Sequence, residues 1–428
     1  MIQPQQITSP MSAERAQAIA ASFDLRALPA DFLANPFPVY ATLREHEPVR
    51  RMPDGSLFLT RHADLMAVYR DAAVFSSDKH VEFAPKYGVD SPLYEHHTTS
   101  LVFNDPPLHT RVRKLIMGAL TRRAIADMEP GLVALVDQLL DRIEAQGGGD
   151  LIEDFASAIP VEIIGNLLGV PHQDRDPLRD WSLAILGALE PVPTPEQHAA
   201  GNRSVTEMLA YLRTLVAERR KAPGDPERDV LTRLIQGEAN GEKLSEVELL
   251  QNCIFLLNAG HETTTNLIGN GLILMQEFPA QREQLLADLR AATDAATNEQ
   301  VLTLAVDECL RFESSNQLGN RRALSAATVG GAALEPGALV TLCIGAANRD
   351  PAVYEQPETL NLRREGNKHL AFGFGIHQCA GLSLARLEGR IAIGRFLVRF
   401  PRFELSAPPV RGGRARFRGF LSAPFRTA

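Results

Sequence analysis

One long helical pattern constrains the fold of this chain more than any other feature. The sequence predicts a helix from Ser245 to about Phe278, and Pro279 ends it because proline cannot continue a helix. Ser245 and Glu248 have the spacing of a capping box, in which each side chain accepts a hydrogen bond from the backbone of the other. Roughly 33 residues at about 1.5 Å each give a rod about 50 Å long, enough to cross a whole domain.

Weaker patterns complete the expected architecture. Helical periodicity dominates from about residue 108 to 235, and glycine-interrupted alternation after residue 323 predicts strands. We also expect a helix at about 38–47, a strand and a helix at 55–71, a long polar loop at about 78–103 and a strand pair at 414–426. The chain is therefore predicted to be one mainly α domain with minor β-structure, spanning 1–428. Its α-rich region is expected at about 105–322, and its β-containing regions at about 45–75 and 323–428.

Composition excludes several classes of protein. Hydrophobic residues make up 45% and charged residues 22% of 428, as in an ordinary globular chain with ample core. A net charge of −8 without a basic stripe argues against nucleic acid as a partner. No signal-peptide pattern opens the chain, and no run of about 18 apolar residues predicts a membrane span. Cys253, Cys309 and Cys343 stand singly in apolar runs and are expected to be buried, which suits a reducing, cytoplasmic setting.

The fourth cysteine has a different environment. Gly373, Gly375 and Gly381 surround Cys379, and a helical pattern begins directly afterwards. The glycines allow a bulky group to approach the backbone, and free N–H groups at the helix start would stabilise a thiolate. From these residues alone Cys379 is either a nucleophile, with His377 as a nearby base, or a soft metal ligand.

The stretch "FGFGIHQCAG" resembles the haem-binding loop of the cytochrome P450 monooxygenases. The match covers six defining positions, which are Phe372, Gly373, Gly375, His377, Cys379 and Gly381. The resemblance implies that Cys379 is the axial thiolate of a haem b iron and that Phe372 packs on the same side of the haem. It also implies the family's fold, a triangular prism of helices with a long central helix over the haem and small β-sheets.

The middle of the long helix, "NAGHETTTN", is similar to the family's oxygen-activating segment. Ala259 and Gly260 correspond to the small pair that leaves room for O2, and Glu262 and Thr263 to the acid and hydroxyl that deliver protons. Because this acid and hydroxyl are both present, the resemblance favours true monooxygenation over a peroxide-dependent reaction.

Two further segments resemble structural and haem-binding elements of the family. "DECLRF" places Glu308 and Arg311 one helical turn apart, as in the buried ExxR element, and Arg364 is its expected third member, with Arg363 as a rival. Two residues depart from the family pattern: Ser315 stands where proline is usual and Asn361 where aspartate is usual. "NDPPLHTRVRK" resembles the segment that grips a haem propionate, and the expected propionate partners are His109, Arg113, Arg321 and His377.

The resemblance implies a monooxygenase that inserts one oxygen atom from O2 into a small organic substrate. Ferredoxin and ferredoxin reductase are the expected electron donors of this monomeric, cytoplasmic enzyme, and a basic docking patch would comprise Arg111, Lys114, Arg122, Arg123 and Arg390. The alternatives are a haem-binding redox or gas sensor without turnover and a peroxide-dependent peroxygenase. Substrate contacts are expected from the 78–103 loop (His80, Tyr87, Tyr94, His96, His97), the helix before Gly260, residues 316–319 and Phe420.

Overall fold

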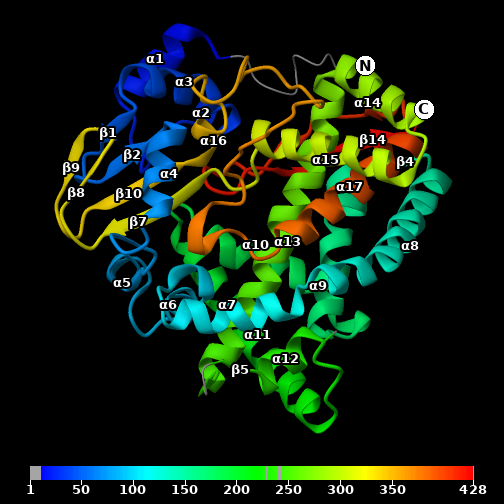
Figure 1. The fold of residues 1–428 in the computed structure, drawn as a ribbon, viewed down its shortest axis with the longest axis horizontal. Coiled ribbons are helices and arrows are strands. Elements are labelled where there is room, and N and C mark those ends of the chain that lie inside the picture. Colours follow the sequence, from blue (N-terminus) through cyan, green and yellow to red (C-terminus); the bar gives the residue numbers. More distant parts are fainter. Residues whose placement is uncertain (1–10, 228, 240–241, 428) are drawn as a thin grey trace.

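The long helix of the computed structural model is α13, Glu246–Glu277, and other helices surround it (Figure 1). The structure describes residues 11–227, 229–239 and 242–427. The predicted capping box is confirmed: the Glu248 N–H donates to Ser245 Oγ at 3.2 Å, and the Ser245 N–H donates to Glu248 Oε2 at 2.8 Å. Most residues of α13 are buried, so this helix forms the axis of the main hydrophobic core.

The remaining helices form the bulk of the molecule. They are α1 (Ala13–Ala21), α2 (Ala30–Ala34), α3 (Phe37–His46), α4 (His62–Arg70), α5 (His80–Tyr87), α6 (Pro92–Thr99), α7 (Leu108–Ala119), α8 (Arg122–Gln146), α9 (Ala158–Leu168), α10 (Leu178–Gly187), α11 (Pro195–Lys221), α12 (Val230–Gln236), α14 (Pro279–Ala291), α15 (Ala295–Phe312), α16 (Ile344–Ala347) and α17 (Leu382–Arg399). The described residues also form the short 3₁₀ helices η2 (Leu101–Phe103), η4 (His172–Asp174) and η5 (Gly375–His377) and the π-helix η3 (Leu151–Ala156).

The strands are short and gather mainly at one side of the helical body (Figure 1). The largest sheet has the order β1-β2-β10-β7-β3, in which only β2 and β10 are parallel, and a three-stranded sheet has the order β11-β14-β4. Three pairs complete the set: β5 with β6, β8 with β9, and β12 with β13. The strands are β1 (Val49–Arg51), β2 (Leu57–Leu59), β3 (Phe75–Ser76), β4 (Gly148–Asp150), β5 (Glu238–Ala239), β6 (Glu242–Lys243), β7 (Leu318–Ala323), β8 (Ala327–Val329), β9 (Ala332–Leu334), β10 (Leu339–Cys343), β11 (Glu404–Leu405), β12 (Val410–Arg411), β13 (Phe420–Ser422) and β14 (Pro424–Arg426).

The predicted fold class, mainly α with small sheets, is confirmed. Some details differ, because short strands occur in the middle of the α-rich region, where β4, β5 and β6 lie. The expected strand pair at 414–426 exists as β13 and β14, but these strands pair with β12 and with β11 and β4 rather than with each other. Cys253, Cys309 and Cys343 are buried as predicted.

The prediction of a long loop at about 78–103 is wrong. Helices α5 and α6 and the turn η2 occupy most of this segment. Each helix has only eight residues, too few for a clear periodicity, and α5 contains Pro85, a residue that usually signals a break. A local cap was nevertheless present in the sequence, because the Ser91 hydroxyl accepts from the Tyr94 N–H at the start of α6.

None of the helices in the described part of the chain combines the length and the apolarity that crossing a bilayer requires.

Candidate functional site

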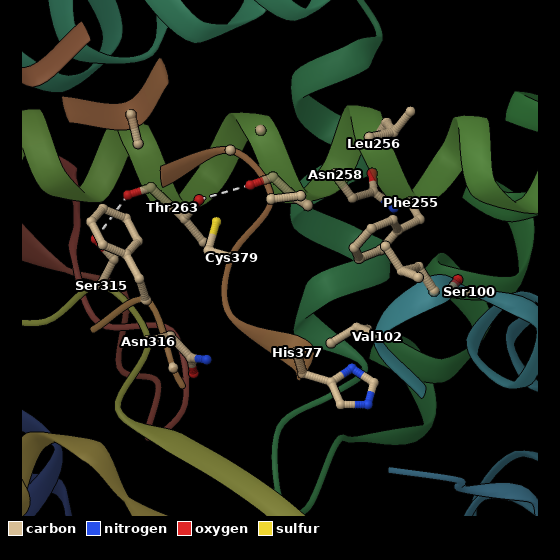
Figure 2. Close-up of a pocket in the computed structure, with 18 of the residues that line it drawn as sticks. Ser100, Val102, Phe255, Leu256, Asn258, Thr263, Ser315, Asn316, His377 and Cys379 are labelled. Atoms are coloured by element: carbon tan, nitrogen blue, oxygen red, sulfur yellow. Dashed lines mark hydrogen bonds between the residues drawn. The ribbon is translucent and has the colours of Figure 1, made fainter. Parts of the chain in front are cut away.

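A cavity of about 350 Å³ lies against the middle of α13 and receives side chains from many parts of the chain (Figure 2). Its walls come from η2, α7, α9, α13, β7, α17 and the cysteine loop at 371–381. Apolar side chains predominate, among them Val102, Ile164, Phe255 and Leu256. The cavity therefore suits an apolar ligand with a few fixed polar contacts.

Cys379 lies on the floor of this cavity and is positioned by its loop (Figure 2). Its backbone N–H donates to the carbonyl oxygen of Phe372 at 2.9 Å, which closes the loop. Gly375 has φ of +74°, and a Cβ there would lie 2.4 Å from the Tyr69 carbonyl oxygen, so glycine is required at this close approach. Gly381 caps α17, which begins at Leu382 as the helical pattern predicted.

Burial controls the protonation of the thiol. It raises the pKa of Cys379, and the Gly381 N–H and the guanidinium groups of Arg113 and Arg386 oppose this rise. The N–H group at the start of α17 thus lowers the pKa of the thiol, as predicted, but burial raises this pKa by more. A bound metal cation would reverse the balance, because a coordinating thiol is deprotonated.

One end of the cavity concentrates basic side chains. The rings of His109 and His377 lie 4.2 Å apart, and His109 Nδ1, His109 Nε2 and His377 Nε2 are buried without a hydrogen-bond partner among the described residues. Arg113 and Arg321 also line the cavity, and the Arg321 guanidinium stacks 5.4 Å from the Tyr69 ring. Burial and the nearby cations, Arg321 first among them, lower the pKa of His377 to about 2. The unpaired ring nitrogens and the two nearby guanidinium groups suit an anionic partner.

Lys79 joins this basic end and was missed by the sequence reasoning. It is 4% exposed and lines the cavity, and its Nζ donates to the Asp78 carbonyl oxygen at 3.2 Å. Burial lowers its pKa to about 8. Nothing in the sequence marks this lysine, because it lies in a segment without a recognisable motif and reaches the cavity only through the fold.

These observations test whether the residues fit a haem. A haem presents two carboxylates and an iron that accepts a soft axial ligand. The cavity offers the Cys379 thiol, which Figure 2 shows, and at one end a cluster of basic groups, in which His109 and His377 have ring nitrogens without a partner among the described residues. The thiol and the basic side chains of this cavity therefore fit the iron and the carboxylates of a haem.

The predicted oxygen-activating residues divide between two cavities. Ala259, Gly260 and Thr263 line the main cavity, where Thr263 Oγ1 donates to the Ala259 carbonyl oxygen at 2.8 Å. A Cβ at Gly260 would lie 3.0 Å from Ile164 Cδ1, so this glycine also lets α9 approach α13 closely. Glu262 instead lines a second cavity of about 20 Å³, on the other side of the helix.

Glu262 is held in that second cavity by an ion pair. Arg414 Nη1 lies 2.5 Å from Glu262 Oε1, and Glu262 Oε2 has no partner among the described residues. Burial raises the pKa of Glu262 to about 7, against the opposing effect of Arg414. Such a carboxyl is partly protonated near neutral pH, as a proton donor must be.

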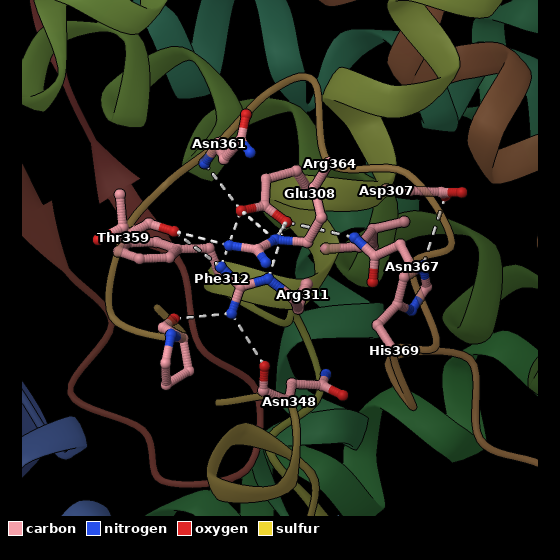
Figure 3. A network of polar contacts seen from close by, with 12 residues as sticks. Asp307, Glu308, Arg311, Phe312, Asn348, Thr359, Asn361, Arg364, Asn367 and His369 are labelled. Atoms are coloured by element: carbon pink, nitrogen blue, oxygen red, sulfur yellow. Dashed lines mark hydrogen bonds and ion pairs between the residues drawn. The ribbon is translucent and has the colours of Figure 1, made fainter. Parts of the chain in front are cut away.

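The ExxR element forms a buried network beside the main cavity (Figure 3). Glu308 and Arg311 are 0% exposed, and two parallel hydrogen bonds of 2.8 Å join their carboxylate and guanidinium. Arg364 Nε contacts Glu308 Oε2 at 3.0 Å, whereas Arg363 pairs with Asp288 on the surface. Arg364, and not Arg363, is therefore the third member of the buried network with Glu308 and Arg311.

Arg311 also ties distant loops to this network. It donates to the carbonyl oxygens of Asn348, Pro357 and Thr359 at 2.8–3.1 Å. Asn361, the departure from aspartate, donates its backbone N–H to Glu308 Oε1 at 2.9 Å, so the side chain is not needed for that contact. The network holds the 348–364 segment that leads into the cysteine loop.

The other departure has a structural role. Ser315 lines the main cavity, and its hydroxyl donates to the Thr263 carbonyl oxygen at 2.8 Å (Figure 2). A proline at this position could not make that bond. The hydroxyl joins the segment after α15 to the polar turn of α13.

The expected substrate contacts are only partly in place. Of the five aromatic and histidine side chains named for the 78–103 segment, His96 and His97 line the main cavity, whereas Tyr87 donates to the Ala188 carbonyl oxygen and His80 pairs with Asp78. Residues Asn316, Leu318 and Gly319 line the cavity as expected. Phe420 does not: it lines the second cavity, and Phe417 takes its place in the main one.

The predicted basic docking patch is also incomplete. Arg111 pairs with Glu248, and Arg390 pairs with Glu299, so both cations are neutralised locally. Lys114, Arg122 and Arg123 are exposed. Sequence position alone could not reveal acidic partners more than 90 residues away.

Comparison with known proteins gives one consistent result. The family model "Cytochrome P450" matches residues 55–412. The chain is 33% identical over 380 residues to a biotin biosynthesis cytochrome P450 of Bacillus subtilis (strain 168), covering 88% of this chain and 92% of the relative. It is 36% identical over 379 residues to the vitamin D(3) 25-hydroxylase of Pseudonocardia autotrophica, covering 88% and 89%.

Solved structures agree with the sequence matches. The structure of P450BioI in complex with hexadec-9Z-enoic acid ligated acyl carrier protein superimposes with a TM-score of 0.85 at 32% identity, covering 93% of this chain and 100% of that one. Family model, relatives and fold coincide with a cysteine loop of the expected geometry. The chain belongs to the cytochrome P450 family.

Proposed function

We propose that Cys379 is the axial ligand of the haem iron in this monooxygenase, and that five basic side chains hold the haem carboxylates: Lys79, His109, Arg113, Arg321 and His377. The enzyme inserts one oxygen atom from O2 into an organic substrate and takes its electrons from an external donor. The bound haem supplies the activation of O2, which a thiolate ligand favours. The observation that carries the assignment is a thiol in the same cavity as a cluster of basic groups, in which His109 and His377 have ring nitrogens without a hydrogen-bond partner among the described residues.

The chain's own contribution is to exclude water and to move protons. Apolar side chains line most of the main cavity, so charges that develop there are poorly screened. Thr263 Oγ1 lies at the cavity wall and can pass a proton to a reacting atom. Glu262 directly precedes Thr263 in the sequence. It carries the proton on Oε2, which has no hydrogen-bond partner among the described residues.

The second cavity gives Glu262 a proton source. Its volume of about 20 Å³ is enough for one water molecule, and polar side chains surround it. They include Arg179, His261, Thr265, Asn266 and Arg414. Protons reach Glu262 by way of this second cavity, and Glu262 then supplies Thr263 on the side of the substrate.

The pH dependence of turnover tests this route. The pKa of Glu262 is raised to about 7, so its carboxyl loses the stored proton as the pH rises through that value. We expect the yield of product per O2 consumed to fall between about pH 6 and 9, and Glu262→Gln, which cannot donate a proton, to give a low yield without this fall.

Arg414 supplies an independent check on the assignment to Glu262. The positive charge of Arg414 lowers the pKa of the Glu262 carboxyl. Arg414→Met is therefore expected to raise that pKa, so that the yield of product per O2 falls at a higher pH than in the wild type. If the pH profile of product yield is the same in the wild type, Glu262→Gln and Arg414→Met, the proton route through Glu262 is contradicted. The yield is measured as product formed per O2 consumed across the pH range.

We further propose ferredoxin, reduced by its reductase, as the electron donor of a monomeric, cytoplasmic enzyme. Exposed Lys114, Arg122 and Arg123 lie in and just after α7, the helix that carries Arg113. These cations would attract an acidic partner. The free thiols of the three buried cysteines suit a reducing compartment.

A further inference from the structure

The wall of the main cavity contains an asparagine whose amide has no partner. Asn258 is on α13, lines the cavity and is 2% exposed. Neither its Nδ2 nor its Oδ1 makes a hydrogen bond within the described part of the chain. Buried amides are nearly always hydrogen-bonded, and each exception needs an explanation. A ligand in the cavity would supply the missing partner.

Some polar groups around Asn258 are already engaged, whereas His97, which also lines the cavity, has a buried Nε2 without a partner in the described part of the chain. Figure 2 shows Asn258 beside Phe255, with Ser100 and Val102 on the facing segment. The Ser100 hydroxyl donates to the His96 carbonyl oxygen at 2.6 Å. Gln251, two helical turns before Asn258, has its Oε1 3.1 Å from His96 Nδ1. Asn258 thus offers an NH2 donor group and a carbonyl acceptor to a ligand in the cavity.

Charge limits what can bind there. Arg416 also lines the cavity, but hydrogen bonds to the Leu318 carbonyl oxygen and to Asn320 Oδ1 fix its guanidinium on β7, and Glu190 offsets part of its charge. The other cations of the lining, Lys79, Arg113 and Arg321, influence the His377 ring and so belong to the basic end. A carboxylate beside Asn258 would be buried without a counter-charge, which is strongly unfavourable.

We propose that the substrate is an uncharged, largely apolar molecule with a hydroxyl or carbonyl group, and that the Asn258 amide binds this group. The proposal rests on the monooxygenase function proposed above and specifies its substrate class. Asn258 precedes Thr263 by five residues, or about 7.5 Å along the helix axis. The oxidised carbon therefore lies several bonds away from the anchored group.

A set of matched probes tests the proposal on the haem-loaded, full-length enzyme. The probes are 1-dodecanol, dodecanoate and 1-chlorododecane, which share a flexible chain and differ only at the terminal group. Binding is followed by the shift of the Soret absorption. We expect 1-dodecanol to bind at least about tenfold more tightly than either of the other two, because a site built for a hydroxyl leaves its polar atoms unpaired with the analogues.

Two variants of the same type separate the anchor from general effects on the cavity. Asn258→Leu keeps the size of the side chain and is expected to reduce the preference for the alcohol over the chloride to about twofold or less. Asn298→Leu, the same change on α15 and outside the cavity lining, is expected to keep the wild-type preference. Oxidation of 1-dodecanol is expected several carbons from its hydroxyl.

Three results would overturn the proposal: tightest binding of dodecanoate, failure of the alcohol to bind, or a preference that survives Asn258→Leu. Its failure is distinguishable from failure of the enzyme function. If only the anchor is wrong, the haem-loaded protein still oxidises some substrate when supplied with ferredoxin, its reductase and O2. If the function is wrong, no member of a wide panel is oxidised.

Discussion

Replacing Glu308 by glutamine is expected to destabilise the protein by about 3–5 kcal/mol, the usual effect of removing one partner from a buried ion pair. The variant leaves the guanidinium of Arg311 buried and removes the charge that also pairs with Arg364. The segment 348–364 is then held less firmly, because Arg311 bonds to three of its carbonyl oxygens. The cysteine loop at 371–381 follows this segment in the sequence. We therefore expect a lower free energy of unfolding and poor retention of haem.

The same helix offers a matched control. Glu299 lies on α15 with Glu308, but it is 62% exposed and pairs with Arg390 at the surface. Glu299→Gln is expected to cost no more than about 1 kcal/mol, as for other exposed pairs. Denaturant unfolding and haem content of the two variants measure the difference. Equal effects would show that the Glu308 network does not hold the site.

Thr263→Ala is expected to separate oxygen consumption from product formation. The variant removes the hydroxyl that lines the main cavity, while the helix keeps its backbone hydrogen bonds. Because a positioned proton donor typically contributes a factor of about 10²–10⁴, we expect the product formed per O2 to fall about tenfold or more. The missing electrons should be recovered as hydrogen peroxide.

Two further variants define the cause. Thr263→Ser keeps a hydroxyl at the same position and is expected to restore most of the yield. Thr303→Ala removes an equivalent bond on α15, from Thr303 Oγ1 to the Glu299 carbonyl oxygen at 2.7 Å, and so reports the effect of losing such a bond outside both cavities. Tight coupling in Thr263→Ala, or equal losses in Thr263→Ala and Thr303→Ala, would refute the relay through Thr263.

The parts of the structure that local signals determine could be predicted from the sequence. Ser245 and Glu248 form their capping box within one helical turn, and Pro279 follows directly, so α13 could be placed almost to the residue. The cysteine loop was also recognisable, because Gly375 must be glycine where the Tyr69 backbone approaches. Short-range constraints of this kind depend little on the rest of the fold.

Features set by packing between distant segments could not be predicted. The sequence places Glu262 beside Thr263, but only the fold shows that Arg414 draws Glu262 into a different cavity. Asn258 and Lys79 carry no motif, and only the fold brings both to the cavity and leaves the Asn258 amide without a partner among the described residues. Helices α5 and α6 were missed because two turns are too few for a reliable periodicity.

The most direct test of the account is the absorption spectrum of the reduced, carbon monoxide-treated protein, because its central claim is the bond between Cys379 sulfur and haem iron. We predict that the wild type shows the red-shifted Soret band that gives the P450 family its name. Cys379→Ser is expected to lack that band and to lose monooxygenase activity. Absence of the band from haem-loaded wild type, or its full retention with activity in Cys379→Ser, would contradict the account.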